Sequence, residues 1–261
     1  MFTLSACADT LFCELPFTER AQRIAAAGFE VEFWGWHDRD MQALADDPGI
    51  HVRSMLGCVV YADGGYIVHP DGVDAYLKGV RQCLEVAKQL DCKNMILVTG
   101  TLDDKGVGNH PIASHPATRW ITAYRALCEV AEIAEKNDVT YCLEPLNTKR
   151  DHPNYSLPFF EDGVKLVEQV GSPRIKLLMD IYHTQIQQGN VIETICNFKD
   201  LLGHVHVADV PGRHEPGTGE INYPRVAETL RDVGYEGSVG LEAYPEESEE
   251  KALGRFRDIF G

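Results

Sequence analysis

Short apolar runs alternate with longer amphipathic stretches along the whole chain. Each run has the length and the β-branched or aromatic content of a strand, and each longer stretch places apolar residues three or four positions apart, as one face of a helix requires. We therefore expect strands at residues 2–7, 31–36, 51–58, 94–100, 139–146, 175–182, 204–210 and 238–244. We expect helices at residues 17–29, 73–90, 120–137, 160–171, 191–198, 223–235 and 248–260.

This regular alternation predicts an α/β fold. Strands that are joined by helices run parallel, and the crossovers between them are right-handed. Eight such units favour a closed barrel over an open sheet, and 261 residues is an ordinary length for one barrel. We therefore predict a single (β/α)8 TIM barrel, one domain that spans residues 1–261.

The composition is that of a folded protein with an acidic surface. Hydrophobic residues make up 44% of the chain, and the formal net charge is -16, which repels nucleic-acid phosphates and anionic lipids. The eight cysteines have no paired spacing, as is typical of reduced thiols. The N-terminal segment has no basic region, and no apolar run reaches the length of a membrane span. We expect a cytoplasmic protein that binds neither nucleic acid nor membrane.

Four polar residues interrupt the apolar runs near the carboxyl ends of the last four predicted strands. They are Glu144, Asp180, His206 and Glu242. In a parallel barrel these ends share one rim, where two unit charges about 4 Å apart repel by ~4 kcal/mol at an effective dielectric near 20. A single acidic residue at a strand end usually forms an ion pair or caps a helix, but three carboxylates and one histidine on four consecutive strands favour a metal site. Three carboxylates and one imidazole suit Mn²⁺ or Mg²⁺, with Co²⁺ also compatible.

Other polar residues near these strand ends have less specific signals. His204 shares the inward face of its strand with His206 but lies one layer deeper, so we interpret it as a core histidine. His183 follows Asp180 by three residues, where the strand is expected to open into its loop, and is a candidate to contact a substrate oxygen. Glu32 lies within an apolar run, and we expect it to be buried and paired, with a supporting role behind the site.

The loop after the seventh strand, within HVHVADVPGRHEPGTGEINY, is rich in Gly and Pro. Its Arg213 offers a guanidinium fork that grips a carboxylate through two oxygens, although a surface salt bridge to Glu215 or Glu220 is the simpler alternative. Aromatic residues at early strand ends predict either an apolar wall that excludes water or plain packing; they are Phe12, Trp34 and Trp36. His69 and His110 are weaker candidates for a substrate contact.

Several motifs resemble the hydroxypyruvate isomerase family, within the superfamily of xylose isomerase-like barrels. They are LFCELPF, AAAGFEVEFWGW, CLEPLN, MDIYHTQIQQGN, GHVHVADVPGRHEPGTGEINY and GLEAY, and they span nearly the whole chain. The resemblance implies a divalent metal, substrate contacts from His183 and Arg213, and acid/base roles for two of the metal ligands, Glu144 and Glu242. The metal ligands that it implies are Glu144, Asp180, His206 and Glu242. It also implies a homodimer or homotetramer.

The residues suit this chemistry. Interconversion of an α-hydroxy ketone and an α-hydroxy aldehyde removes a proton beside a carbonyl and passes through an enediolate, which a Lewis-acidic metal stabilises. Carboxylates with tuned pKa values then move the proton, and Glu144 and Glu242 come from strands on either side of the other two ligands. The first hypothesis is therefore a small hydroxy-oxo acid substrate, with hydroxypyruvate converted to tartronate semialdehyde.

Two other classes of enzyme stay open at this point. A ketose 3-epimerase, or an isomerase of a longer ketose or an inosose, is favoured by His206 and by loops that do not define the substrate. A zinc-dependent apurinic-site endonuclease would recruit His69, His110 and His183 to a multi-zinc cluster, and the net charge of -16 argues against it. A sugar-binding barrel without catalysis would have no use for a complete acid/base set.

Overall fold

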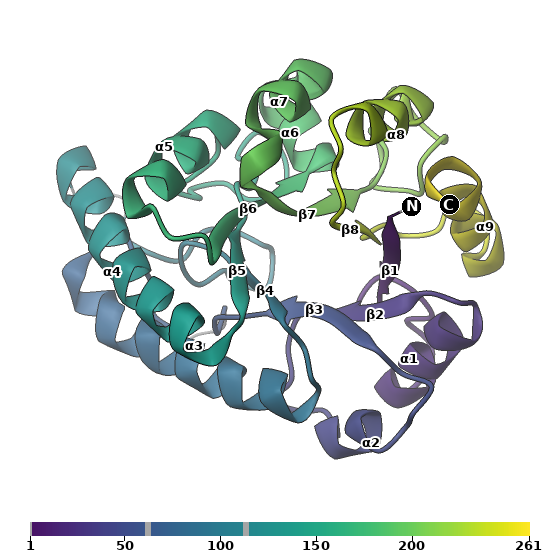
Figure 1. Ribbon diagram of the computed structural model, residues 1–261, viewed down its shortest axis with the longest axis horizontal. Helices are drawn as coiled ribbons and strands as arrows, with labels where there is room; N and C mark the ends of the chain where they lie inside the picture. The colour runs from purple at the N-terminus through teal and green to yellow at the C-terminus, as the bar shows by residue number, and fades with distance from the viewer. Residues whose placement is uncertain (1, 61–63, 112–114) are drawn as a thin grey trace.

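The computed structural model describes residues 2–60, 64–111 and 115–261. Its strands form a closed parallel barrel in which each strand pairs with its neighbours in chain order and β8 pairs with β1 (Figure 1). The strands in the described ranges are β1 (Thr3–Cys7), β2 (Glu30–Phe33), β3 (Val52–Leu56), β4 (Asn94–Leu97), β5 (Thr140–Leu143), β6 (Ile175–Asp180), β7 (Leu202–Val207) and β8 (Ser238–Leu241). The predicted single (β/α)8 barrel is confirmed.

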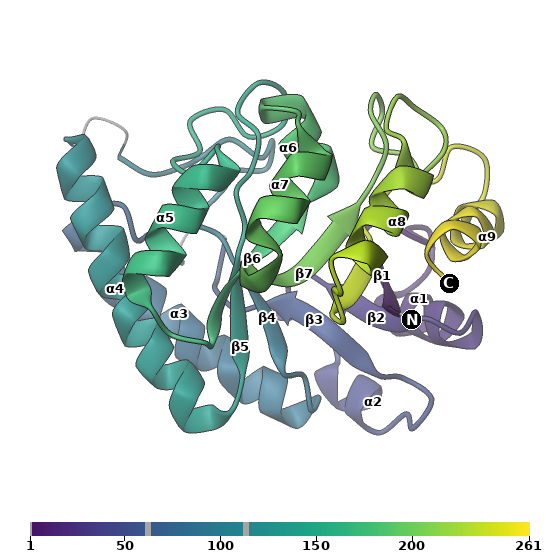
Figure 2. The ribbon, with the colours of Figure 1, turned by 45° about the horizontal axis from the view of Figure 1, so that its top comes forward.

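Helices surround these strands on the outside of the barrel (Figure 2). In the same described ranges they are α1 (Phe17–Ala26), α2 (Met41–Ala45), α3 (Pro70–Gln89), α4 (Pro116–Asn137), α5 (Phe160–Val170), α6 (Ile181–Gln187), α7 (Val191–Phe198), α8 (Tyr223–Asp232) and α9 (Glu249–Phe260). A short 3₁₀ turn, Lys199–Leu201, leads into β7. The periodicity did not predict the short α2 and α6, because five and seven residues are too few to establish a helical repeat.

One predicted boundary is wrong in a way that matters for the site. The sixth strand was expected to run to residue 182 and then open into a loop. Instead it ends at Asp180, whose Oδ1 accepts hydrogen bonds from the backbone N–H groups of Tyr182 (2.8 Å) and His183 (3.2 Å). A carboxylate in this position caps a helix, so α6 begins directly after the strand and His183 lies in its first turn.

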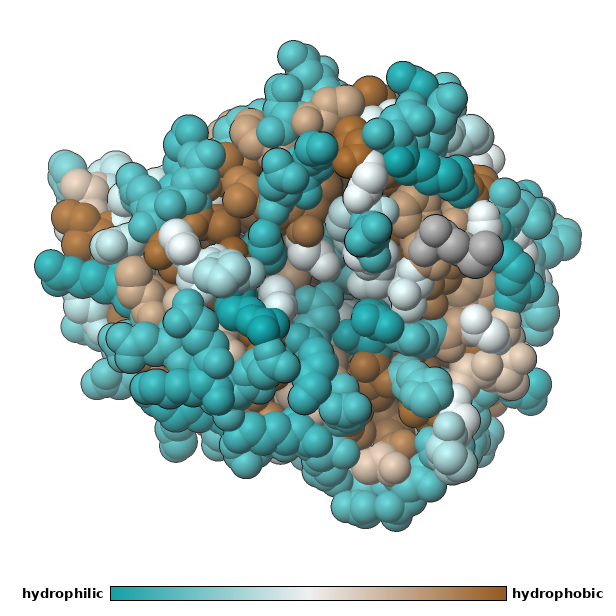
Figure 3. Space-filling view, viewed as in Figure 1, coloured by the Kyte–Doolittle hydropathy of each residue, from teal (hydrophilic) through white to brown (hydrophobic). Residues whose placement is uncertain are grey.

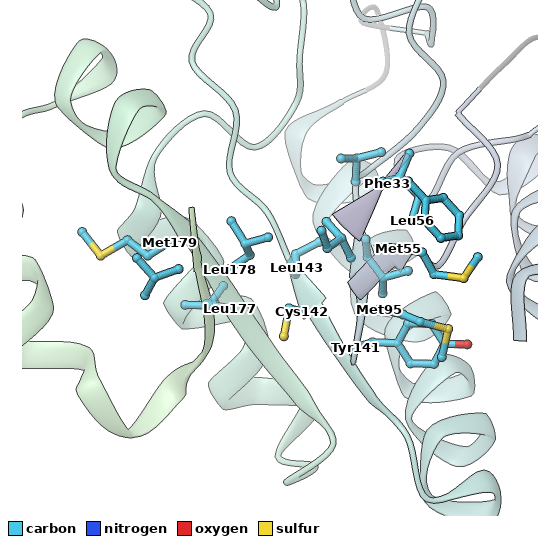
Figure 4. Close-up of a cluster of buried hydrophobic side chains, with 14 of the residues drawn as sticks. Phe33, Met55, Leu56, Met95, Tyr141, Cys142, Leu143, Leu177, Leu178 and Met179 are labelled. Atoms are coloured by element: carbon cyan, nitrogen blue, oxygen red, sulfur yellow. The ribbon is translucent and has the colours of Figure 1, made fainter. Parts of the chain in front are cut away.

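The core consists of strand side chains that are buried inside the barrel and beneath the helices, together with the inward-facing side chains of the helices. Figure 4 shows part of it, contributed by strands β2 to β6. The labelled members are Phe33, Met55, Leu56, Met95, Tyr141, Cys142, Leu143, Leu177, Leu178 and Met179. Burial on both faces explains why the strands read as nearly continuous apolar runs instead of alternating ones.

The surface and the ends of the chain agree with this arrangement. The two termini lie side by side, since the rings of Phe2 and Phe260 have centroids 6.3 Å apart. The face seen in Figure 3 is largely covered by polar and charged residues, with smaller apolar areas between them. None of the helices in the described ranges combines the length and the apolar content needed to cross a membrane.

The barrel register places the predicted ligands at one level. Asp180 pairs with His206 across β6 and β7, and His206 pairs with Gly240 across β7 and β8. Glu144 and Glu242 each follow the last residue of their strand, β5 and β8. Since parallel strands end on the same rim, these four positions meet there even though nearly 100 residues separate the first from the last.

Candidate metal and substrate site

The structure brings the four predicted metal ligands together. One ligand atom from each of Glu144, Asp180, His206 and Glu242 lies within 4.8 Å of all the others. His206 Nδ1 lies 3.9 Å from Glu144 Oε1 and 3.6 Å from Glu242 Oε2. All four side chains are buried, with at most 6% of any residue exposed. The group therefore has the ligand types, the spacing and the shielding from water that a divalent cation site needs.

Arg213 lies against this cluster and not on the outer surface. Its Nη2 contacts Glu242 Oε2 and lies 3.4 Å from Asp180 Oδ2, and its guanidinium carbon lies 5.1 Å from the centroid of the Tyr182 ring. The alternative of a surface salt bridge to Glu215 or Glu220 is wrong. Glu215 pairs with Arg255 at 2.7 Å, while three buried carboxylates attract the guanidinium of Arg213 inward.

The cluster separates the pKa values of the two glutamates. Burial raises the pKa of Glu144 well above its ordinary range, and the nearby Glu242 raises it further. Burial also acts to raise the pKa of Glu242, but Arg213 and His206 outweigh it and bring that pKa below its usual value. One carboxyl group is thus favoured in its protonated form and the other as a carboxylate, a pairing that suits acid and base roles.

His206 has one engaged and one unengaged ring nitrogen. Its Nε2 lies 2.8 Å from Glu32 Oε2, whereas its buried Nδ1 has no hydrogen-bond partner among the described residues. Burial alone would lower the pKa of this imidazole, but Glu242 and Glu32 raise it to about 10. A buried nitrogen that faces two glutamates without a hydrogen bond is an atom that a bound cation would satisfy.

His183 is held in one orientation by Asn147. The side-chain amide nitrogen of Asn147 lies 2.6 Å from His183 Nδ1, and the backbone N–H of Asn147 also points to this atom at 3.4 Å. Because both Asn147 groups are donors, Nδ1 is the acceptor and Nε2 carries the proton. Burial lowers the pKa of His183 well below its usual range, so the ring is neutral. Its Nε2 lies 3.5 Å from Asp180 Oδ2, at the edge of the ligand cluster.

The aromatic residues from the early strands have different places. Trp34 was expected either to wall an apolar pocket or simply to pack, but its indole Nε1 donates a hydrogen bond to Glu242 Oε1 at 2.6 Å, so it makes a polar contact with the cluster. Trp36 packs toward α3, with its Nε1 3.5 Å from the sulfur of Cys83. Phe12 is buried in the core, and its backbone N–H lies 3.3 Å from Glu249 Oε1.

The remaining histidines do not support a multi-zinc cluster. His69 caps α3 by accepting a hydrogen bond from Asp71 N at 3.3 Å, and His110 is buried. Within residues 2–60, 64–111 and 115–261, neither of the groups of His, Cys, Asp and Glu that could hold a metal includes His69, His110 or His183. The second of these groups is Glu32, His204 and His206. His204 is fully buried, as expected of a core histidine, and Glu32 is buried and paired.

Asp209 and His152 are two further residues near the site, besides Asn147 and Tyr182, that had no role assigned from the sequence. Asp209 accepts hydrogen bonds from the backbone N–H groups of Val210, Ile221 and Gly217, and so holds together the loop that carries Arg213. His152 has its ring 5.1 Å from that of His183. The position of Asp209 directly after the HVHVA run was a signal for a loop anchor. No local pattern marks His152.

Comparison with known proteins identifies the family of the chain and relatives that are named as isomerases. Residues 18–259 match the family model described as xylose isomerase-like TIM barrel. The chain is 37% identical to a 2-oxo-tetronate isomerase of Cupriavidus necator over 259 residues, which cover 96% of each protein. It is 30% identical to the hydroxypyruvate isomerase of Escherichia coli over 260 residues, 97% of each. Among solved structures, a family 2 AP endonuclease from Brucella melitensis superposes with a TM-score of 0.89 at 28% identity, over 99% of both chains.

Proposed function

Because the chain belongs to the xylose isomerase-like TIM barrel family, and two relatives are named as isomerases of 2-oxo acids, we propose that this isomerase acts on a short 2-oxo acid with a hydroxyl on the neighbouring carbon. Hydroxypyruvate, which would be converted to tartronate semialdehyde, is the first candidate. The observation that carries the proposal is the convergence of three carboxylates and one imidazole nitrogen, on four consecutive strands, within 4.8 Å.

A divalent cation fits this donor set. Glu144, Asp180, His206 and Glu242 would hold it, and the unengaged Nδ1 of His206 is the atom whose hydrogen bonding such an ion would complete. Oxygen ligands with a single imidazole suit Mn²⁺ and Mg²⁺, and Co²⁺ is compatible with them. When bound, the ion supplies Lewis-acid stabilisation of the negative charge that develops on the substrate oxygens.

The two glutamates provide the proton transfer. Isomerisation of hydroxypyruvate removes a proton from C3, which bears the hydroxyl, and delivers a proton to C2, the former carbonyl carbon, through an enediolate. The hydroxyl proton on the C3 oxygen passes to the C2 oxygen, so C3 becomes the aldehyde and C2 carries the hydroxyl. Glu242, which Arg213 and His206 favour as a carboxylate, accepts the C3 proton. Glu144, which burial favours in the protonated form, delivers a proton to C2. Exchange with solvent then restores both glutamates.

His183 and Arg213 orient the substrate. The Nε2–H group of neutral His183 donates a hydrogen bond to a substrate oxygen, since Asn147 fixes the proton on that nitrogen. Arg213 provides the guanidinium that a substrate carboxylate requires, and its stacking on Tyr182 limits the orientations that it can take. A 2-oxo acid would thus be bound through its carboxylate and one oxygen beside the reacting carbons.

A ketose 3-epimerase is the second candidate, because Glu144 and Glu242 approach the cluster from strands on either side of it. Epimerisation at one carbon needs an acid/base group on each face of the substrate, whereas isomerisation can proceed with one such group. Arg213 argues for the acid substrate, because a neutral ketose has no carboxylate to pair with a buried guanidinium.

The test is a metal-supplemented assay of hydroxypyruvate, 2-oxo-tetronate and a panel of ketoses, with Glu144→Gln and Glu242→Gln as variants. We expect turnover of one or both 2-oxo acids, and a loss of about 10²–10⁴-fold in kcat in each variant. Deuterium from D₂O should enter C2 of the product, because Glu144 exchanges with solvent between turnovers. Turnover of ketoses alone would replace the first candidate by the second, and full activity in both variants would remove the proposed acid/base roles.

A further inference from the structure

The carboxylate of Glu32 is fully engaged inside the barrel. Its Oε2 accepts from His206 Nε2 at 2.8 Å, and its Oε1 lies 2.9 Å from His204 Nε2. Ser5 donates its hydroxyl to Oε1 as well. Glu32 is 2% exposed, and it reaches His206 across the barrel from β2, 174 positions away in the sequence.

The chemistry of Glu32 determines which nitrogen of His206 faces the ligand cluster. A carboxylate accepts hydrogen bonds, and Glu32 Oε2 lies 2.8 Å from His206 Nε2 while Ser5 donates to Oε1. His206 must therefore carry a proton on Nε2. Its Nδ1 is then the nitrogen that faces Glu144 and Glu242 and is available to a cation.

The barrel leaves space for this carboxylate at Gly240. A Cβ atom built on Gly240 would lie 2.6 Å from Glu32 Oε1 and 2.7 Å from Oε2, which is closer than a carbon and an oxygen atom can approach without displacement. Gly240 pairs with His206 in the register of β7 and β8. The interior of such a barrel is ordinarily filled by branched apolar side chains. Here the missing side chain on β8 admits a charged group from β2 at the level of His206.

We propose that Glu32 is a positioning residue for the metal centre, which holds the Nε2 proton and the ring plane of His206 so that Nδ1 is directed at the cation. The proposal rests on the proposed function, because it presupposes that the cluster binds a metal. His204 is not a ligand in this arrangement. It shares the carboxylate through Oε1 and has its Nδ1 2.7 Å from the hydroxyl oxygen of Ser238, away from the cluster.

The test measures metal affinity without turnover. Calorimetric titration of Mn²⁺ into the metal-free protein compares the wild type with Glu32→Gln, which keeps one amide oxygen as an acceptor, and Glu32→Leu, which keeps none at similar volume. Loss of the partner of a metal-bound histidine typically costs 10–100-fold in affinity, so we expect losses in that range, larger for Glu32→Leu than for Glu32→Gln. Circular dichroism and thermal unfolding of the metal-free variants establish whether they fold. If Glu32→Leu does not fold, the comparison of Glu32→Gln with the wild type is the test.

Two further variants separate positioning of His206 from damage to the core. His204→Gln keeps a donor toward Glu32 Oε1 and should leave Mn²⁺ affinity unchanged within error. Gly240→Ala places a methyl group on β8 against the carboxylate of Glu32, displaces that carboxylate, and should weaken affinity as Glu32→Gln does.

The outcomes distinguish this proposal from the proposed function. Wild-type affinity in Glu32→Gln, or an equal loss in His204→Gln, overturns the positioning role while the metal site remains. A wild-type protein that binds no Mn²⁺, Mg²⁺ or Co²⁺ overturns the metal-dependent function, and the positioning role with it.

Discussion

The side-chain amide nitrogen of Asn147 lies 2.6 Å from His183 Nδ1, and this contact decides which nitrogen of the imidazole carries the proton. Asn147 lies in the loop after β5, and His183 lies in the first turn of α6, directly after β6. Their contact exists because β5 and β6 are neighbours in the barrel. Asn147 is itself held by Asp151, whose Oδ2 accepts from the same amide group at 2.7 Å. The protonated Nε2 of His183 is thereby directed to the edge of the ligand cluster.

Replacement of Asn147 by Asp should reverse this preference. A carboxylate offers no donor to Nδ1, so the proton moves to Nδ1 and the substrate loses a hydrogen-bond donor at Nε2. We expect kcat/KM to fall about tenfold, the equivalent of one hydrogen bond of ~1.4 kcal/mol. Steady-state kinetics measures the change, and Thr148→Val on the same loop is the control. Equal kcat/KM in Asn147→Asp and the wild type would contradict the role of this contact.

Removal of the indole donor should raise the pKa of Glu242 and loosen the orientation of its carboxylate. Trp34→Phe retains an aromatic ring but loses the 2.6 Å hydrogen bond to Glu242 Oε1. We expect kcat to fall by about three- to tenfold, as for one hydrogen bond to a charged group, with little change in thermal stability. Trp36→Phe, which removes only a contact with Cys83, should behave as the wild type in the same assay.

Arg213 should stabilise the protein chiefly when no metal is present. Its guanidinium pairs with Glu242 and Asp180, so Arg213→Gln leaves buried carboxylates without their cation and should destabilise the metal-free protein by about 3–5 kcal/mol. Mn²⁺ replaces the missing charge. Thermal unfolding with and without Mn²⁺ should therefore show a larger metal-induced increase in Tm for the variant than for the wild type.

The stability of the metal-free protein should fall at alkaline pH. The pKa of His206 is about 10 in the folded protein, raised by Glu242 and Glu32 against the effect of burial, and about 6.5 in the unfolded chain. A raised pKa contributes stability that is fully present below pH ~6.5 and is lost as the pH rises toward 10. Denaturant unfolding in EDTA at pH 6 and pH 9 measures the loss. His206→Gln should lack this component, and an identical slope in both proteins would exclude His206 as its source.

Chelation should abolish activity reversibly. Dialysis against EDTA removes the cation that the cluster of Glu144, Asp180, His206 and Glu242 is proposed to hold, and Mn²⁺ or Mg²⁺ should restore turnover. Asp180→Asn is the informative variant, because Asp180 is proposed as a ligand without an acid/base role. Its activity should recover only at higher metal concentrations, and metal-independent turnover in the wild type would contradict the proposal.

Local patterns in the sequence were sufficient to predict the barrel and the composition of its ligand cluster. Strand and helix periodicities depend on neighbours a few positions apart, and parallel strands share a rim wherever they end. Glu144, Asp180, His206 and Glu242 could therefore be identified as neighbours from their positions at strand ends alone.

The contacts that orient those residues depended on the closed barrel. Closure through β1 and β8 brings β2 within reach of β7, so Glu32 contacts His206 inside the barrel. Arg213 turns inward toward carboxylates whose relative positions the sequence did not specify. The start of α6 directly after Asp180 was not predicted from the pattern, because one capping carboxylate outweighed the apolar run that continued past it. Residue types along the chain determined what the site is made of. Which atom of each side chain faces the centre was decided by hydrogen bonds between segments far apart in sequence, which form only once the barrel has closed.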